Sequence, residues 1–211
     1  MLSEGIRIRF SKTGKLKYIS HLDLCRTFRS AFKRARIPIW YSQGFNPHPK
    51  MVFATTVSVG HESLCELLDI KITSPMSREE LVSRLQSALT EEIGIIDAYK
   101  SERKFTELRY AGYEIFTEEE LTNEEVQRAV LSPMVIIKRT KSGEKEDDIA
   151  RLVKSVSVED GRIVGAFSAL QNEFLGPDNF IKGLSASLGR EINTLKVIRT
   201  HVYDCEMNEF E

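Results

Sequence analysis

Two histidines and an aspartate in the first fifty residues are candidates for acid–base chemistry on RNA. His21 and Asp23 lie in the segment Tyr18-Ile-Ser-His-Leu-Asp23, and His48 lies in Gln43-Gly-Phe-Asn-Pro-His-Pro-Lys50. RNA is cleaved without a metal when a base activates the 2′-hydroxyl and a cation steadies the phosphate. One hypothesis is therefore a metal-independent ribonuclease, or another RNA-modifying enzyme, that uses His21, Asp23 and His48. The alternative is a surface that binds RNA without acting on it.

A helix is predicted between these two motifs, from Leu22 to Arg36. Apolar residues recur along it with a helical period, and Ser20 precedes it as an N-cap with Asp23 three residues on. Pro38 should prevent the helix from continuing. Basic residues at spacings of three, four and three form a second stripe: Arg26, Arg29, Lys33 and Arg36. The helix is expected to bury one side and to present this cationic stripe on another.

The loop from Gln43 to Lys50 follows this helix. Gly44 adopts backbone angles that other residues avoid, and the prolines at 47 and 49 stiffen the chain after it. Between them lie an aromatic ring, an amide and an imidazole, those of Phe45, Asn46 and His48. Such a loop is suited to holding a planar polar ligand. The structural alternative is a turn in which Phe45 fills the core.

The charge of the chain is distributed unevenly. The whole chain of 211 residues has a net charge of −1, but residues 1–50 hold eleven Lys or Arg and two acidic residues, a net charge of +9. The remaining residues hold nineteen Lys or Arg and twenty-nine acidic residues, a net charge of −10. A basic segment on a nearly neutral chain indicates a local anionic partner, for which nucleic acid is the obvious candidate.

We therefore predict an RNA-binding surface in the first fifty residues. Cations attract phosphates, and unpaired bases are bound by stacking on aromatic rings and by hydrogen bonds to their edges. The predicted RNA-binding residues are Tyr18, Arg26, Arg29, Lys33, Arg36, Tyr41, Gln43, Phe45, Asn46 and Lys50. A third hypothesis is a protein-interaction subunit whose basic helix docks an acidic partner.

Several kinds of site lack their usual sequence patterns. There is no phosphate-binding loop, no dinucleotide-binding glycine motif and no Cys-x-x-Cys, so no cofactor is expected. His21 and Cys25 stand four residues apart but have no evident third ligand, so no metal site is expected. Cys25, Cys65 and Cys205 are odd in number and far apart, which is typical of reduced thiols in a cytoplasmic protein. No apolar run is long enough to span a membrane.

Two similar orders of elements are predicted along the chain. The first has strands at 6–10, 37–41, 51–59, 65–73 and 94–99, with the basic helix after the first strand and a helix capped by Ser77 before the last. The second has strands at 110–116, 134–140, 149–158, 162–170 and 194–205, a helix capped by Thr122 and a helix from Gly176 to about Leu188. Residues 141–148 are expected to form a charged, mobile loop.

These orders predict an α+β protein of two domains. Apart from the additional strand at 51–59, the first order is the β-α-β-β-α-β plan of a ferredoxin-like sandwich. The expected fold is two tandem ferredoxin-like sandwiches with antiparallel sheets. The first domain spans residues 1–100 and contains the basic helix and the Gly-Phe-Asn-Pro-His-Pro loop, and the second spans residues 109–211.

The motifs that carry these groups resemble a known family. Arg9-Phe-x-Lys-x-Gly14, Tyr18-Ile-Ser-His-Leu-Asp23, Tyr41-Ser-Gln-Gly-Phe-Asn-Pro-His-Pro-Lys50 and Gly60-x-Glu-Ser63 are similar to the radical-SAM-linked family, a domain of unknown function. The resemblance implies a radical SAM protein as partner. This chain lacks the Cys-x-x-x-Cys-x-x-Cys of such an enzyme. Together with the basic segment, the resemblance favours a tRNA-directed accessory protein in RNA modification.

Overall fold

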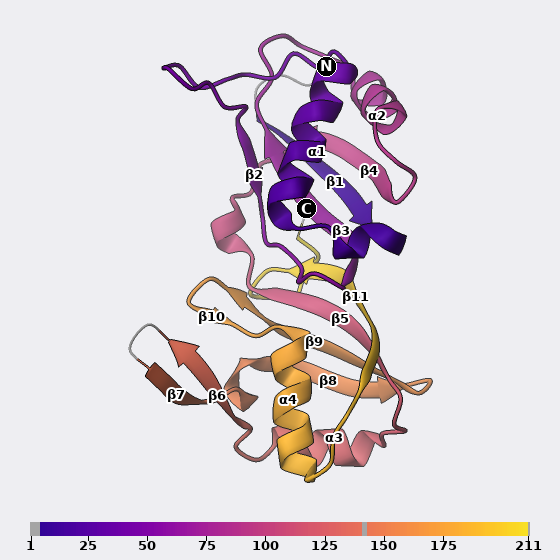
Figure 1. The fold of residues 1–211 in the computed structure, drawn as a ribbon, viewed down its shortest axis with the longest axis vertical. Helices are drawn as coiled ribbons and strands as arrows, with labels where there is room; N and C mark the ends of the chain where they lie inside the picture. Colours follow the sequence, from indigo (N-terminus) through magenta and orange to yellow (C-terminus); the bar gives the residue numbers. More distant parts are fainter. Residues whose placement is uncertain (1–4, 141–142, 211) are drawn as a thin grey trace. The chain divides into compact units, whose positions relative to one another are not determined.

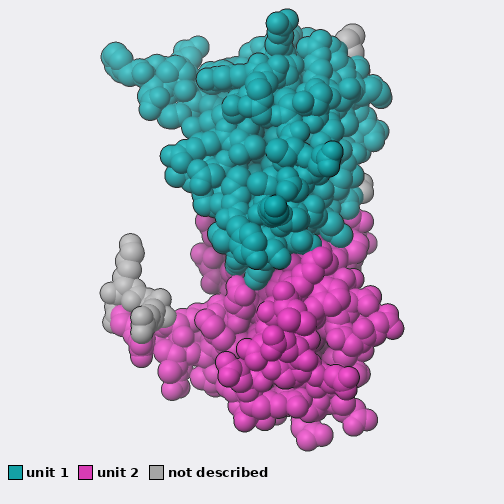
Figure 2. Space-filling model, turned by 45° about the vertical axis from the view of Figure 1, so that its right-hand side comes forward, with its two compact units in different colours: residues 1–107, 211 teal, residues 108–210 magenta. Residues whose placement is uncertain are grey.

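The computed structural model describes residues 5–140 and 143–210. It divides the chain into two compact units, of which the first ends at Glu107 and the second begins at Leu108 (Figure 2). Each unit combines α-helices with β-strands (Figure 1), so the mixed α and β class is confirmed.

Unit 1 has a four-stranded antiparallel sheet in the order β4-β1-β3-β2. The strands are β1 (Ile6–Lys12), β2 (Met51–Phe53), β3 (Glu62–Ile70) and β4 (Ile93–Lys100), and the helices are α1 (His21–Arg34) and α2 (Arg78–Ser87). A short 3-10 helix, η1 (Gly14–Tyr18), precedes α1, and another, η2 (Phe105–Glu107), follows β4.

The core of unit 1 lies between one face of this sheet and the two helices. Alternate residues of β1 are fully buried, and Phe10 contacts Phe28 of α1 edge-on, with ring centroids 4.8 Å apart. The predicted N-cap of α1 is confirmed, because the Ser20 hydroxyl accepts a hydrogen bond from the Asp23 amide at 3.1 Å. These contacts hold α1 against the sheet and leave its far side exposed.

A buried arginine organises the other face of this sheet. Arg7 is 0% exposed, and its guanidinium donates two hydrogen bonds to Asp69, of 2.7 and 3.0 Å. It also donates to the carbonyl of Arg103 and lies 4.1 Å from the ring centroid of Phe105. Arg7 therefore ties the segment after β4 to the sheet through a charge-assisted network.

Two predicted strands of unit 1 are shorter than expected. Residues 37–41 form only isolated bridges, Ile39 with Ile72 and Tyr41 with Pro49. The prolines at 38 and 49 have no amide hydrogen to donate, which interrupts the ladder there. The strand predicted at 51–59 is β2, which ends at Phe53. The Ala54 amide still donates to the Leu67 carbonyl of β3, and further on the Gly60 amide donates to the carbonyl of Lys17.

Unit 2 has an antiparallel sheet in the order β8-β9-β5-β11. The strands are β5 (Tyr110–Thr117), β8 (Val153–Glu159), β9 (Arg162–Leu170) and β11 (Thr194–Tyr203), and the two-residue strand β10 (Glu173–Phe174) also pairs with β9. The helices are α3 (Asn123–Val130) and α4 (Pro177–Leu188). Tyr113, Phe167 and Phe180 stack between the sheet and α4, which lies across one sheet face (Figure 1).

Local sequence signals in unit 2 are confirmed. Thr122 and Glu125 form a complete capping box at the start of α3. The turn between β8 and β9 has positive φ at Asp160 and Gly161, as a two-residue hairpin requires. Pro177 opens α4, and Gly189 ends it with φ of 64°.

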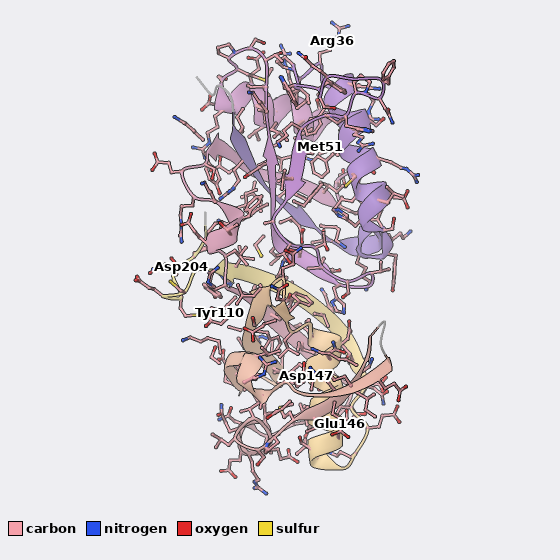
Figure 3. The ribbon with its side chains drawn as sticks, turned by 90° about the vertical axis from the view of Figure 1, so that its left-hand side faces the viewer. Arg36, Met51, Tyr110, Glu146, Asp147 and Asp204 are labelled. Carbon is pink, nitrogen blue, oxygen red and sulfur yellow. The ribbon has the colours of Figure 1, made fainter. Side chains whose placement is uncertain are left out.

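The loop predicted at 141–148 is largely a strand. Gly143–Asp148 forms β7, which pairs with β6 (Val135–Thr140) in a separate two-stranded sheet, and residues 141–142 lie outside the described residues. The prediction of a loop was wrong because the charged side chains of this segment, Glu146 among them, belong to an exposed strand (Figure 3). Among the described residues, no helix is sufficiently long and apolar to span a bilayer.

Candidate nucleic-acid interface

The basic stripe of α1 is more varied than its spacing predicts. Arg26 is exposed but bound by Asp23, with 2.8 Å between Nη1 and the carboxylate. Arg29 is half-buried, and its Nε has no hydrogen-bond partner among the described residues. Lys33 and Arg36 are exposed, and we find no ion pair for either within the part of the chain that is described. Lys33 and Arg36 therefore place two uncompensated charges at the C-terminal end of α1.

Arg36 does not continue the helical stripe. The helix ends at Arg34, and the Arg36 backbone is left-handed, with φ of 51°. The Arg36 amide donates to the carbonyl of Lys33 at 3.2 Å, and the Ile37 amide donates to that of Phe32 at 3.0 Å. This pair of bonds is a Schellman motif, in which glycine normally takes the place of Arg36. The turn, rather than Pro38, ends the helix and directs Arg36 outward at the end of unit 1 (Figure 3).

The loop 43–48 projects from unit 1 at this same end (Figure 1, Figure 2). Its base is closed by hydrogen bonds between Ser42 and His48, from the Ser42 amide to the His48 carbonyl and from the His48 amide to the Ser42 hydroxyl. The predicted ligand-binding residues Gln43, Asn46 and Lys50 are all exposed. Phe45 is 113% exposed, more than in an extended reference chain, so it does not fill the core. Tyr41 at the base is 37% exposed.

A second group of predicted residues lies at the opposite, N-terminal end of α1. Tyr18 is exposed in η1, and His21 and Asp23 occupy the first turn of the helix. The His21 ring contacts Phe53 edge-on with 5.1 Å between centroids, and its Nε2 lies 3.6 Å from the sulfur of Cys25. The N-terminal part of α1 therefore places an imidazole beside a half-buried thiol.

The electrostatics of this end oppose an acid–base role for Asp23 and Cys25. The hydrogen bond from the Ser20 hydroxyl, followed by the one from Arg26, holds the pKa of Asp23 below its usual value. Asp23 is therefore ionised at neutral pH and is a weak base. Burial raises the pKa of the Cys25 thiol, and the nearby charge of Arg29 only partly opposes it.

His21 and His48 lie on different segments. A helix of fourteen residues rises by about 1.5 Å per residue, or about 20 Å, and the projecting loop leaves unit 1 near the end of α1 that lies away from His21 (Figure 1). The structure thus brings Lys33 and Arg36 to the end where the loop lies. It places Tyr18, His21 and Asp23 at the other end, with Arg26 and Arg29 between.

Sequence reasoning missed two features. His61 and Glu62, which follow the turn at Gly60, are buried, and the Lys12 Nζ donates to the His61 carbonyl at 3.1 Å. Unit 2 also has a pocket to which no role was given. The alternation of β5 indicated which residues share a face, but not that Tyr110 would line a cavity. No group of three or more His, Cys, Asp or Glu in the described residues is placed to hold a metal ion.

These observations define a two-unit α+β protein with a basic helix end and a projecting aromatic loop. The chain belongs to a family described as an uncharacterized protein conserved in bacteria (DUF2344), whose model matches residues 5–175. This confirms a domain of unknown function. No curated protein matches the chain.

Proposed function

We propose that this protein binds RNA, tRNA in particular, through the projecting loop and the adjacent end of α1. Under this proposal it acts as an accessory protein that presents RNA to a separately encoded radical SAM enzyme. The radical SAM partner rests on the resemblance of the motifs around His21 and His48. We further propose that both units are ferredoxin-like sandwiches, since four strands of each share one order.

The observation that carries the RNA-binding proposal is the complete exposure of Phe45. Because the Phe45 ring is exposed, it contributes no hydrophobic burial to the stability of the fold. Stacking of such a ring on an unpaired base contributes about 1–3 kcal/mol to binding. Lys33, Arg36 and Lys50 are exposed cations of the same end of unit 1, suited to the phosphates on either side of such a base. An aromatic tip with flanking cations is the combination that binds single-stranded RNA.

The two alternatives have less support. Cleavage by His21, Asp23 and His48 requires all three at one phosphate, but His48 lies on the projecting loop and the other two at the far end of α1. Docking of an acidic protein accounts for the cations, and aromatic residues also anchor protein interfaces, so the co-purification experiment below decides between it and RNA binding. The basic segment and the motifs that resemble the radical-SAM-linked family together favour RNA binding.

The test measures binding of labelled tRNA to the full chain by fluorescence anisotropy over a range of salt concentrations. We expect Phe45→Ala to weaken binding by about 1–3 kcal/mol, and Lys33→Ala to weaken it and reduce the salt slope by about 1. Leu131→Ala and Lys182→Ala are matched controls, because both side chains are exposed in unit 2. Equal affinity in Phe45→Ala and Leu131→Ala would remove the basis of the proposal.

The partnership is tested separately, by co-purification of the tagged chain with a radical SAM protein from cells that make both. Recovery of the pair only when RNA is intact supports presentation of RNA. Recovery after ribonuclease treatment, with no RNA affinity in the purified chain, would instead favour the protein-docking alternative.

A further inference from the structure

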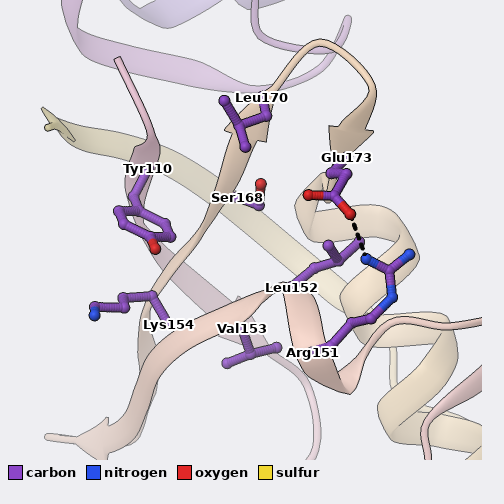
Figure 4. A pocket seen from close by; sticks show the side chains of 8 residues that line it. All are labelled: Tyr110, Arg151, Leu152, Val153, Lys154, Ser168, Leu170 and Glu173. Carbon is purple, nitrogen blue, oxygen red and sulfur yellow. Dashed lines mark hydrogen bonds and ion pairs between the residues drawn. The ribbon is translucent and has the colours of Figure 1, made fainter. Parts of the chain in front are cut away.

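Unit 2 has a pocket of about 340 Å³ on the sheet face that α4 does not cover. Side chains alternate along a strand, so Tyr110 points away from Tyr113, which stacks toward α4. The lining residues come from β5, η3 (Ala150–Leu152), β8, β9 and β10 and are Tyr110, Arg151, Leu152, Val153, Lys154, Ser168, Leu170 and Glu173 (Figure 4). The volume is at the lower end of the range of about 300–1,000 Å³ for small-molecule sites.

Strand register builds the pocket. Tyr110 is directly opposite Ser168 of β9 on one side and Tyr203 of β11 on the other. Residues directly opposite one another in adjacent strands present their side chains on the same face. Lys154 lies at an irregularity where Val153 pairs with Phe167 but Ser155 pairs with Ala166, so the extra residue turns Lys154 toward the pocket. Tyr110 and Lys154 therefore form one side of the cavity, and Arg151 and Glu173 form the other (Figure 4).

The two cations of the pocket are not equivalent. Arg151 is bound by Glu173 at 2.8 Å and by Asp147 at 3.3 Å, so acidic groups already neutralise it. Lys154 is exposed, has no carboxylate partner among the described residues and lies 5.5 Å from the ring centroid of Tyr110. Lys154 is therefore the group that can receive an anion.

An aromatic row continues from Tyr110 across the same face. The Tyr203 ring lies over Gly112, where an added Cβ would come within 3.1 Å of it. His201 stacks on Tyr203, with 5.6 Å between centroids and 17° between the planes, and is exposed. Gly112 thus allows Tyr203 to lie flat against the sheet, and the row offers planar surfaces beside one available cation.

From this combination we propose that unit 2 binds an unpaired nucleotide of RNA. The base packs against the aromatic row at Tyr110, the phosphate pairs with Lys154, and the largely buried Ser168 hydroxyl offers a hydrogen bond. This inference rests on the proposed RNA-binding function and adds a second contact region to it. The apolar walls at Leu152 and Leu170 distinguish the pocket from a site for a bare anion.

The experiment follows backbone amide resonances of the full chain by NMR during titration with tetrauridylate, adenosine monophosphate and inorganic phosphate. We expect both nucleotides to shift the amides of Tyr110, Lys154 and Ser168, and inorganic phosphate to shift them only at far higher concentration. Lys154→Glu should weaken tetrauridylate binding at these amides by about tenfold or more, as should Tyr110→Leu. Lys182→Glu is the matched control for the change of charge. Because Lys154 is exposed, Lys154→Glu should fold and so tests the site even if Tyr110→Leu does not fold.

The outcomes separate this inference from the proposed function. If tRNA binds and Phe45→Ala weakens it, but the pocket amides do not respond to either nucleotide, the nucleotide site is wrong and the proposed function stands. If the pocket amides respond while Phe45→Ala and Lys33→Ala bind tRNA normally, the proposed surface of unit 1 is wrong and the pocket stands. Equal responses to phosphate and nucleotides would also overturn the inference.

Discussion

Replacing Arg36 by glycine should stabilise the protein and, if the proposed function holds, weaken the binding of RNA at the same time. Arg36 is the left-handed residue of the Schellman motif after α1, with φ of 51°. A residue other than glycine destabilises the folded state by about 1–2 kcal/mol in this conformation, and glycine removes that cost. Glycine also has more conformational freedom in the unfolded chain, which offsets about 0.5–1 kcal/mol of the gain in stability. The Arg36 side chain is exposed, so its removal loses no core packing. The expected increase in the free energy of unfolding is about 0.5–1 kcal/mol.

The expected loss of binding follows from the position of the charge. Arg36 is exposed and close in sequence to the projecting loop, so it is expected to neutralise one phosphate. Its removal should make the slope of log affinity against log salt concentration shallower by about 1. Arg36→Ala is the matched variant, because it removes the same charge but keeps the strained backbone.

The two measurements are chemical denaturation and tRNA anisotropy on the same three proteins. Arg36→Gly should be more stable than wild type and Arg36→Ala should not be, while both should lose affinity equally. An Arg36→Gly variant that is no more stable than Arg36→Ala would refute the assigned strain. An unchanged salt slope in both variants would refute the assigned phosphate contact.

Two further predictions concern the frame that holds this surface. Arg7→Ala should lower the free energy of unfolding by about 3 kcal/mol, because it leaves Asp69 and the Arg103 carbonyl without their buried partner. Chemical denaturation measures this change, and the control Lys100→Ala should have a much smaller effect because Lys100 is exposed. Because the folded pKa of Asp23 is lowered, its contribution to stability is fully present above the unfolded pKa of about 3.8 and is lost as the pH falls through the lower folded value. The stability difference between wild type and Asp23→Asn should therefore be present at about pH 6 and absent at about pH 2, and a difference that grows on acidification would contradict the assignment.

The sequence predicted best what is decided locally. The caps at Ser20 and Thr122, the hairpin at Gly161 and the stop at Gly189 each depend on a few neighbouring residues, and all four are confirmed. The antiparallel character of the sheets also followed, because alternation of apolar residues indicates strands with one buried face.

The errors arose where distant parts of the chain decide the structure. Composition made residues 143–148 resemble a solvated loop, but pairing with β6 makes them a strand. Helical spacing grouped Arg36 with Arg26, although a left-handed turn ends the helix before Arg36. The pocket of unit 2 depends on β5, β8 and β9 meeting in register, and the sequence carries no local signal of that register.

Arg36 and Phe45 share a property that bears directly on function. Phe45 exposes its whole side chain at the tip of a projecting loop, and Arg36 occupies a backbone conformation that glycine adopts more easily. Neither residue is explained by the stability of unit 1, since a polar residue at 45 and glycine at 36 would serve the fold as well or better. Both lie at the same end of the unit, together with Lys33. A contact made by this surface would account for these residue types, and under the proposed function a stacked base flanked by phosphates accounts for the ring and the cations together.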